Sequence, residues 1–418
     1  MGDPVLTQPK IKKVSVFSVA NPEHAIASLR LVAPLSEAGI DVIWRMPDQD
    51  YDQDSLVGSD LVIIQRDFPR FVDQYIRIHS DAHRFRIPVV FEIDDLLWEL
   101  PEDHPDRLSH HYTEALIPMM FAALAADALT VATPGIKDYL IWLNPNIFVL
   151  PNYLNPKFWR INQPETSSRD STIIGYMGGD SHRPDLEMIE PALVNILDRH
   201  HGEVKFKTWG LEPTRRLLEH PLVEWSPLSP GDYQGFAELF SQQVLDIYIL
   251  PLQDSLFNRA KSSIKLLEFT SMGISGVSSD IVPYRNVVIP DVSGMVADSI
   301  NQWESHLDFL IANEDKRVEM TLRAQETLTN DWLLSDHFHI WQQAYENIIS
   351  SYSKREDIPR ILQLMSTIMI QSGDQTKQLR IEINDIQTQL NLLTQSRSWQ
   401  VSQAFRKFFA SILPDRNN

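Results

Sequence analysis

The sequence predicts an α/β protein in which two Rossmann-like, doubly wound domains face a cleft and a helical extension follows them. Short β-branched runs alternate with helical patterns as far as about residue 350, which is typical of parallel βαβ units. The 418 residues exceed the usual size of one domain, and 43% of them are hydrophobic, which is enough for two cores.

The first series of elements predicts an amino-terminal lobe over residues 1–160. A helical pattern over 24–38 ends at Gly39, and glycine suits the carboxyl cap of a helix. The expected strands are 14–19, 41–44, 61–65, 88–93, 128–132 and 147–150.

A polar stretch over 161–171 lacks apolar periodicity and predicts a linker to a second lobe over 172–353. The expected strands of this second lobe are 172–177, 204–209, 223–225, 245–250, 276–278 and 294–296. Ligands of open α/β sheets bind outside the carboxyl ends of the strands, so we expect the chemistry in the cleft between the two lobes.

Residues 354–395 predict a helical segment with a short heptad pattern. About two heptads obey the alternation of four and three residues, and Ser372-Gly373 is expected to interrupt any longer coil. The segment therefore predicts either a coiled coil that pairs subunits into a homo-oligomer or one helix packed on its own protein. The apolar heptad positions are Leu379, Ile383, Ile386, Leu390 and Leu393.

The last segment, 396–418, predicts a basic amphipathic helix and tail. Its only charged residues between Ser396 and Leu413 are two arginines and a lysine, in an otherwise acidic protein. An apolar stripe beside cationic residues suits the surface of an anionic membrane, here through residues 396–413, and the alternative is a helix docked on a partner subunit. The apolar stripe comprises Val401, Ala404, Phe405, Phe408, Phe409 and Ile412, with Trp399 ahead of it.

Composition excludes several classes of protein. The formal charge of −19 disfavours nucleic acid as a partner, and the absence of cysteine removes disulfides, thiolate zinc sites, iron–sulfur clusters and cysteine nucleophiles. No run approaches the about 20 apolar residues of a membrane span. We therefore expect a cytoplasmic protein, which the tail could hold at the inner face of the cell membrane.

The densest cluster of reactive side chains lies in 251–268, directly after an apolar strand. A helix is expected to begin near Ser262 or Ser263 and to end at Gly273, with Lys261, Lys265 and Glu268 on a common face. A helix amino terminus and two lysines suit a nucleotide diphosphate, and Glu268 could accept hydrogen bonds from a ribose diol. The alternative is a solvated helix face with an ordinary lysine–glutamate pair.

These residues resemble a known family. The segment Asn-x-x-Lys-Ser-x-x-Lys-x-x-Glu, from Asn258 to Glu268, resembles the donor-binding half of retaining GT-B glycosyltransferases of the family-4 type (glycosyl transferase group 1). The similarity extends over roughly residues 14–350. Its other landmarks are 174–179 with His182 and Asp185, then 273–279, Tyr284 through Gly294, 126–133, 150–152 and 30–39.

The resemblance implies roles for individual residues. Glu268 would bind the donor ribose, Lys261 or Lys265 would compensate the pyrophosphate charge, and Gly178 and Gly179 would let the backbone approach the donor or the acceptor. The chain departs from the family at one point, because the position of a second glutamate, eight residues before Glu268, is occupied by Ala260. Asp254 or Asn258 is expected to substitute for it by reaching the hydroxyls of the donor sugar.

The first half places three carboxylates, Glu92, Asp94 and Asp95, where an apolar strand runs out into the cleft. Adjacent carboxylates in a dry site raise one another's pKa, so Asp94 or Asp95 could serve as a catalytic base near an acceptor hydroxyl or orient that sugar. The alternative is that Asp94 caps a turn and Glu92 pairs with a neighbouring base. The histidine that the family often carries in this region is absent.

No cofactor or metal is assigned. The Asp-x-Asp repeats of 48–54 could hold a divalent ion, as in the other major glycosyltransferase fold, but they follow Pro47 in an expected acidic loop. The histidines lack metal-ligand spacing, and the glycine motifs of dehydrogenases, P-loop ATPases and serine hydrolases are missing.

The expected function is therefore transfer of a sugar from a nucleotide diphosphate to a hydroxyl of a glycan or lipid-linked glycan, in a cell-surface polysaccharide pathway. Because of Ala260, the second expectation is a catalytically degenerate protein that binds sugar nucleotide or glycan and acts as an assembly scaffold. A metal-dependent transferase is the third.

Overall fold

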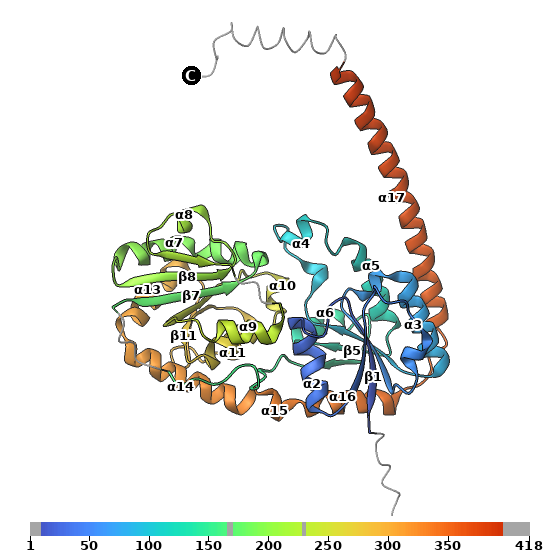
Figure 1. The fold of residues 1–418 in the computed structure, drawn as a ribbon, viewed down its shortest axis with the longest axis horizontal. Coiled ribbons are helices and arrows are strands. Elements are labelled where there is room, and N and C mark those ends of the chain that lie inside the picture. The colour runs from blue at the N-terminus through green and yellow to red at the C-terminus, as the bar shows by residue number, and fades with distance from the viewer. Residues whose placement is uncertain (1–9, 165–169, 228–230, 396–418) are drawn as a thin grey trace, which may run out of the picture. The chain divides into compact units, whose positions relative to one another are not determined.

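The structure, a computed structural model, describes residues 10–164, 170–227 and 231–395. Within them lie two six-stranded sheets, and every strand pair in both is parallel (Figure 1). All twelve strands coincide with the expected ones to within two residues at either end.

The amino-terminal sheet has the order β2-β1-β3-β4-β5-β6, so the strand order reverses between β1 and β3. Ligands bind outside the carboxyl ends of the strands at such a switch point. Its strands are β1 (Lys13–Phe17), β2 (Asp41–Arg45), β3 (Leu61–Gln65), β4 (Val89–Ile93), β5 (Ala128–Val131) and β6 (Ile147–Val149).

The carboxy-terminal sheet has the order β12-β11-β10-β7-β8-β9, which places its own switch point between β7 and β10. The polypeptide that follows these two strands, after residues 178 and 250, therefore borders the expected ligand crevice. Its strands are β7 (Thr172–Gly178), β8 (Val204–Gly210), β9 (Val223–Ser226), β10 (Ile247–Leu250), β11 (Ser275–Ser279) and β12 (Met295–Ala297).

Helices connect the strands in both lobes. The amino-terminal lobe has α1 (Ala25–Ala27), the π-helical turn η1 (Ser28–Val32), α2 (Ala33–Glu37), η2 (Gln53–Leu56), η3 (Phe68–Arg70), α3 (Val72–Phe85), η4 (Leu97–Glu99), α4 (Pro105–Leu108), α5 (Thr113–Ala125) and α6 (Pro134–Leu140). The carboxy-terminal lobe has η5 (Asp180–His182), α7 (Arg183–Arg199), α8 (Arg215–Leu218), α9 (Tyr233–Phe240), α10 (Leu256–Arg259), α11 (Ile264–Ser271), α12 (Val282–Arg285), α13 (Ile300–Ala312) and α14 (Glu314–Asp331).

Two apolar cores cover the two faces of the carboxy-terminal sheet. Residues of α7 and α13 pack on one face, and residues of α9 and α11 pack on the other. Leu154 and Trp159 belong to the second of these cores, although both precede the expected linker. The expected end of the first lobe at residue 160 therefore lies several residues beyond the point where the chain enters the second lobe.

After α14 the chain returns to the first lobe through α15 (Leu334–His337) and α16 (His339–Ser351). Trp341 and Tyr345 are fully buried in the core formed by β1, β3 and α2, and the Trp341 indole donates to the Arg30 carbonyl at 2.9 Å. The expected extent of the second lobe, 172–353, is thus corrected at its end. The last two of its helices complete the core of the first lobe, because that lobe alone leaves an apolar face uncovered.

The chain divides into a compact unit over 1–359 and a second unit over 360–418. The helix α17 (Ile358–Gln395) crosses that boundary and continues through Ser372 and Gly373, so the helical segment expected over 354–395 is present. Leu379, Ile383 and Ile386 are more than half exposed on it, and the coiled coil stays a prediction.

The expected amphipathic tail, 396–418, lies outside the described residues. Among the helices described, none is long and apolar enough to cross a bilayer.

Candidate functional site

Two adjoining cavities lie where the carboxyl ends of the strands of both lobes meet. The lysine cavity, of about 180 Å³, is lined by Asp94 and Asp95 from one lobe and by Lys261, Ser262 and Lys265 from the other. The glutamate cavity, of about 370 Å³, is more apolar and includes Glu268 in its wall. The two cavities share the lining residues Ala25, Leu29, Ile264 and Lys265.

The helix α11 positions the lysines and the glutamate. It begins after the cap residue Ser263 and gives way to Gly273, whose φ of +85° suits glycine, as expected. Lys265 lies in its first turn, while Lys261 lies before the helix with its ammonium group 4.5 Å from the centre of the Phe257 ring. The common helical face expected for both lysines is therefore corrected, although both reach the lysine cavity.

Lys265 is a cation in a dry environment. Among the described residues no carboxylate lies within ion-pair distance of its ammonium group. Burial, reinforced by the nearby charge of Lys261, lowers the pKa of Lys265 to about 8. A ligand that carries negative charge into the cavity would relieve this repulsion and restore the charged form.

Glu268 is buried one turn further along α11, with 3% of its surface exposed. The Tyr233 hydroxyl donates a hydrogen bond to its Oε1 at 2.7 Å, and the Trp159 indole donates to the Tyr233 oxygen at 3.1 Å. Burial raises the pKa of Glu268 to about 7, although the tyrosine and Lys265 favour the ionised form.

On the opposite wall, the strand β4 delivers Asp94 and Asp95 to the lysine cavity. One oxygen of Asp94 accepts a hydrogen bond from Arg66 at 3.0 Å, and the other has no partner among the described residues. Burial raises the pKa of Asp94 to about 7, with Asp95 and Glu92 adding to the effect and Arg66 opposing it. Asp94 can therefore exchange a proton near neutral pH.

Glu92 has a structural role instead. It forms a buried ion pair with Arg30, from Nε to Oε1 at 2.7 Å, and its other oxygen accepts from Gln65 at 3.1 Å. Arg30 also donates to the Leu150 carbonyl and to the Asn152 side chain, and the Asn152 amide donates to Ser262 at 3.0 Å. The ion pair confirms the alternative expected for Glu92, pairing with a neighbouring base. The contacts link Glu92, at the end of β4, to Ser262 in the wall of the lysine cavity.

His182 and Asp185, which follow β7, form a pair at the edge of the lysine cavity. Their Nδ1 and Oδ2 atoms lie 2.8 Å apart, and Asp185 Oδ1 accepts from the Gln253 backbone at 2.7 Å. Burial lowers the pKa of His182 well below its usual value, and Lys265 and Lys261 add to the effect. This lowered pKa favours the neutral form of the His182 ring.

Two residues expected to contact the donor sugar, Asp254 and Asn258, line neither the lysine cavity nor the glutamate cavity. Asp254 is 62% exposed at its side chain and forms a two-pronged ion pair with Arg259, and its contact with the donor sugar stays a prediction. Asn258 is buried and its amide donates to the Gln253 carbonyl at 2.9 Å, which holds the loop before α10. Gly178 ends β7 and Gly179 follows it, and neither lines the two cavities.

Ala260, which stands where the resembled family has a glutamate, is part of the contact between the lobes. It is 2% exposed, and a Cβ atom added to Gly135 in α6 would lie 3.2 Å from the Ala260 Cα. The Thr133 hydroxyl donates to the Ala260 carbonyl at 2.7 Å. A long acidic side chain therefore has no room at this position in the observed arrangement.

Sequence reasoning missed Tyr233, and it had assigned no role to Arg30 or to Trp159. No local pattern marks Tyr233, because Glu268 is 35 residues away and Trp159 is 74 residues away. Arg30 had only one signal, its place in the expected first helix, where the structure has the π-helical turn η1. Such turns occur often at functional sites.

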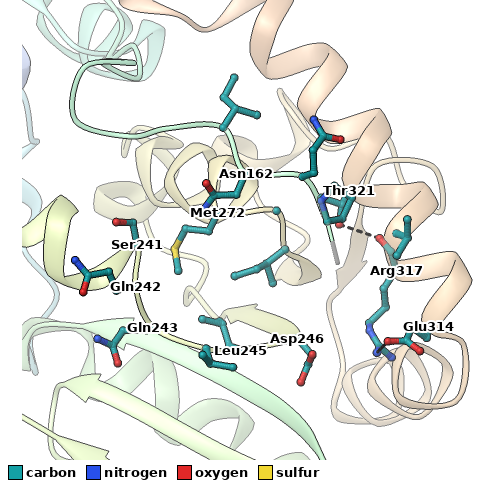
Figure 2. Close-up of a pocket in the computed structure, with 17 residues that line it drawn as sticks. Asn162, Ser241, Gln242, Gln243, Leu245, Asp246, Met272, Glu314, Arg317 and Thr321 are labelled. Atoms are coloured by element: carbon teal, nitrogen blue, oxygen red, sulfur yellow. Dashed lines mark hydrogen bonds and ion pairs between the residues drawn. The ribbon is translucent and has the colours of Figure 1, made fainter. Parts of the chain in front are cut away.

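A larger hollow, of about 500 Å³, lies elsewhere in the second lobe (Figure 2). Asp246 and Leu245 in its wall precede β10, and Met272 precedes β11, so it opens at the amino ends of these strands. Because parallel sheets bind ligands at their carboxyl ends, we do not assign the chemistry to this hollow.

The acidic loop expected over 48–54 is largely exposed, and Asp52 in it caps η2. In the part of the chain that the structure describes, no group of three or more His, Asp or Glu side chains could hold a metal ion.

Comparison with known proteins gives a consistent picture. No family model matches the chain. TuaH of Bacillus subtilis (strain 168), named as a teichuronic acid biosynthesis glycosyltransferase, is 25% identical over 181 residues, which cover 39% of this chain and 41% of TuaH.

Two solved structures resemble the fold over most of the chain. Sucrose-phosphate synthase from Thermosynechococcus elongatus superposes with a TM-score of 0.59 at 13% identity, over 82% of this chain and all of that one. HepE from Anabaena, solved in complex with UDP-glucose, gives 0.56 at 12% identity, over 81% and 99% of the two chains. The chain has the GT-B fold. The predicted fold class is therefore confirmed, with its two lobes, its cleft and its carboxy-terminal helical part.

Proposed function

We propose that this GT-B protein is a glycosyltransferase that moves a sugar from a nucleoside diphosphate to a hydroxyl of a glycan or lipid-linked glycan. The observation that carries the proposal is the lysine cavity. In it, two ammonium groups, one of them without a carboxylate partner among the described residues, face two carboxyl groups across the cleft. Cations on one wall suit a diphosphate, and carboxyl groups on the other suit sugar hydroxyls.

The donor would occupy both cavities. Its diphosphate would lie beside Lys261, Lys265 and the amino terminus of α11, whose first N–H groups have no partner within the helix. Its ribose would reach Glu268, and its base would enter the apolar part of the glutamate cavity, beside Met177 and Phe236. The transferred sugar would then face Asp94 and Asp95.

Catalysis would come from holding donor and acceptor together and from stabilising the leaving diphosphate. Negative charge develops on the leaving diphosphate, and the lysines and the helix terminus supply positive charge beside it. A metal ion is therefore not required for that step. Asp94, with its pKa raised to about 7, is suited to accept the proton of the attacking hydroxyl. Retention of configuration is proposed from the resemblance to family-4 enzymes alone.

The setting is proposed from the relatives. TuaH carries a teichuronic acid name, and HepE binds UDP-glucose. These favour a uridine diphosphate sugar as donor and a cell-surface polysaccharide as product. Work at the inner face of the cell membrane, held there by residues 396–413, and pairing of subunits through α17 belong to the same proposal.

Calorimetry with a panel of nucleoside diphosphates, followed by a donor hydrolysis assay, tests the proposal. The double variant K261A/K265A should lose nucleotide affinity by at least tenfold, because each lysine makes a charge-assisted contact with the diphosphate. K316A is the matched control, since Lys316 is exposed on α14 and pairs with Glu319, away from both cavities. Unchanged affinity in the double variant would overturn the proposal, and activity that persists in excess chelator would support independence from metal.

A second candidate function is a degenerate GT-B protein that binds its ligand without turnover and acts as a scaffold. Ala260 supports it, because it stands where the resembled family has a glutamate, and so does Asp254, because it is exposed and paired with Arg259. Binding without hydrolysis or transfer, over a broad panel of donors and acceptors, would select this candidate.

A further inference from the structure

Three side chains beside the glutamate cavity form a directed hydrogen-bond chain. The Trp159 indole donates to the Tyr233 oxygen at 3.1 Å, and the Tyr233 hydroxyl lies 2.7 Å from Glu268 Oε1. An indole N–H can only donate a hydrogen bond. Because the tyrosine oxygen accepts from the indole, its own proton is directed to the carboxylate.

This chain leaves one side of the carboxylate for a ligand. The Tyr233 hydroxyl occupies Oε1, whereas Oε2 has no hydrogen-bond partner among the described residues. Glu268 lines the glutamate cavity, where a ligand could meet this second oxygen. Tyr233 is itself held in place by stacking with Phe236, with ring centres 6.1 Å apart, and its backbone N–H donates to the Glu23 carbonyl of the other lobe at 3.0 Å. The carboxylate is therefore oriented before any ligand arrives.

We propose that Tyr233, fixed by Trp159, is a positioning residue that aims Glu268 at a vicinal diol and makes the site select ribonucleotides over 2′-deoxyribonucleotides. The inference rests on the proposed function, since it assumes that a nucleoside diphosphate enters the glutamate cavity. A carboxylate held at one oxygen meets two neighbouring hydroxyls in a single geometry. A ribose that lacks the 2′-hydroxyl leaves part of the buried charge without a partner, and such losses discriminate strongly.

The alternative role for Tyr233 is packing alone. Its ring is 4% exposed and belongs to an aromatic cluster with Phe158, Trp159 and Phe236. The substitution Y233F keeps the ring and removes only the hydroxyl, so packing is largely retained while the carboxylate loses its donor. W159F removes the indole N–H instead, and it weakens the direction of the tyrosine proton without touching Glu268.

The test compares matched pairs of nucleotides by calorimetry: UDP with 2′-deoxy-UDP, GDP with 2′-deoxy-GDP and ADP with 2′-deoxy-ADP. The unmodified protein should bind one ribonucleotide about tenfold or more tighter than its deoxy partner, as expected for a lost hydrogen bond to a charged group. Y233F should bring the ribonucleotide down to the affinity of the deoxy form, which itself should stay within about twofold. W159F should shift the ratio in the same direction by a smaller factor.

Two results would overturn the inference: a ribose preference that persists in Y233F, or an equal loss of affinity for both members of a pair. If Y233F does not fold, W159F decides by the same ratio, and an unchanged ratio in it counts against the inference. Failure of all six nucleotides to bind the unmodified protein would instead refute the proposed function. The two failures are therefore distinguishable.

Discussion

The affinity for a nucleoside diphosphate sugar should follow a bell-shaped pH profile with its maximum near pH 7.5. Two groups in the proposed donor site titrate in this range, because burial raises the pKa of Glu268 to about 7 and lowers that of Lys265 to about 8. The ribose diol favours ionised Glu268, and the diphosphate favours protonated Lys265. The diphosphate of a sugar nucleotide is itself fully ionised throughout, so the profile reports the protein.

The magnitude follows from the two ionisations. At pH 7.5 each group is in its binding form in about three molecules of four, whereas at pH 6 only about one Glu268 in ten is ionised. At pH 9 only about one Lys265 in ten keeps its proton. If only the doubly correct form binds, the affinity falls about sixfold at either end, or about 1 kcal/mol.

Calorimetry with UDP-glucose at pH 6, 7.5 and 9 measures the profile, and two variants separate its limbs. E268Q should remove the loss on the acidic side, because an amide does not titrate. K265R should remove the loss on the alkaline side, because a guanidinium keeps its charge. Asp94 and Asp185 also titrate nearby but are present in every variant, so the differences isolate the two groups. A flat profile in the unmodified protein would refute the reasoning. So would an acidic loss of affinity that persists in E268Q together with an alkaline loss that persists in K265R.

Three further predictions concern stability and the contact between the lobes. R30M should lower the free energy of unfolding by about 3–5 kcal/mol in chemical denaturation, because it leaves the buried charge of Glu92 without its partner. The double variant R30M/E92M should recover most of that loss. Equal losses in both variants would argue against the ion pair. E268Q should melt at a higher temperature than the unmodified protein at pH 8 but not at pH 4.5. The pKa of Glu268 is higher in the folded protein than in the unfolded chain, so its contribution to stability is present at pH 4.5 and is lost as the pH rises to about 7. A difference in melting temperature that does not change with pH would contradict this. A260E should separate the two lobes, because Ala260 packs against Gly135, and the separation should appear as a larger radius of gyration in X-ray scattering. A260S should leave the radius unchanged. An unchanged radius in A260E would show that the structure around Ala260 can accommodate the larger side chain.

Much of the fold could be predicted because its signals are local. A β-branched run between turn residues reads as a strand wherever it occurs, and the twelve strands were found in this way. The limits of α11 followed from Ser263 and Gly273, which cap a helix by backbone geometry within a few residues. The helix α17 continues through Ser372 and Gly373, because neighbouring helix formers outweigh one glycine.

The candidate site was predicted only in part. Spacing brought Lys265 and Glu268 to one helix, and strand polarity brought Asp94 and Asp95 to the cleft. The ion pair between Asp254 and Arg259, five residues away, was not anticipated.

What the sequence determined by itself was the order of strands and helices along the chain, the doubly wound class and the run of residues that forms α11, since these depend on interactions within a few positions of the chain. Only the tertiary structure decided that Arg30 neutralises Glu92, that Tyr233 holds Glu268 and that Ala260 meets the other lobe. Each of these contacts joins segments far apart in the chain, and it exists only because the packing of two sheets and the return of α16 set the side chains face to face.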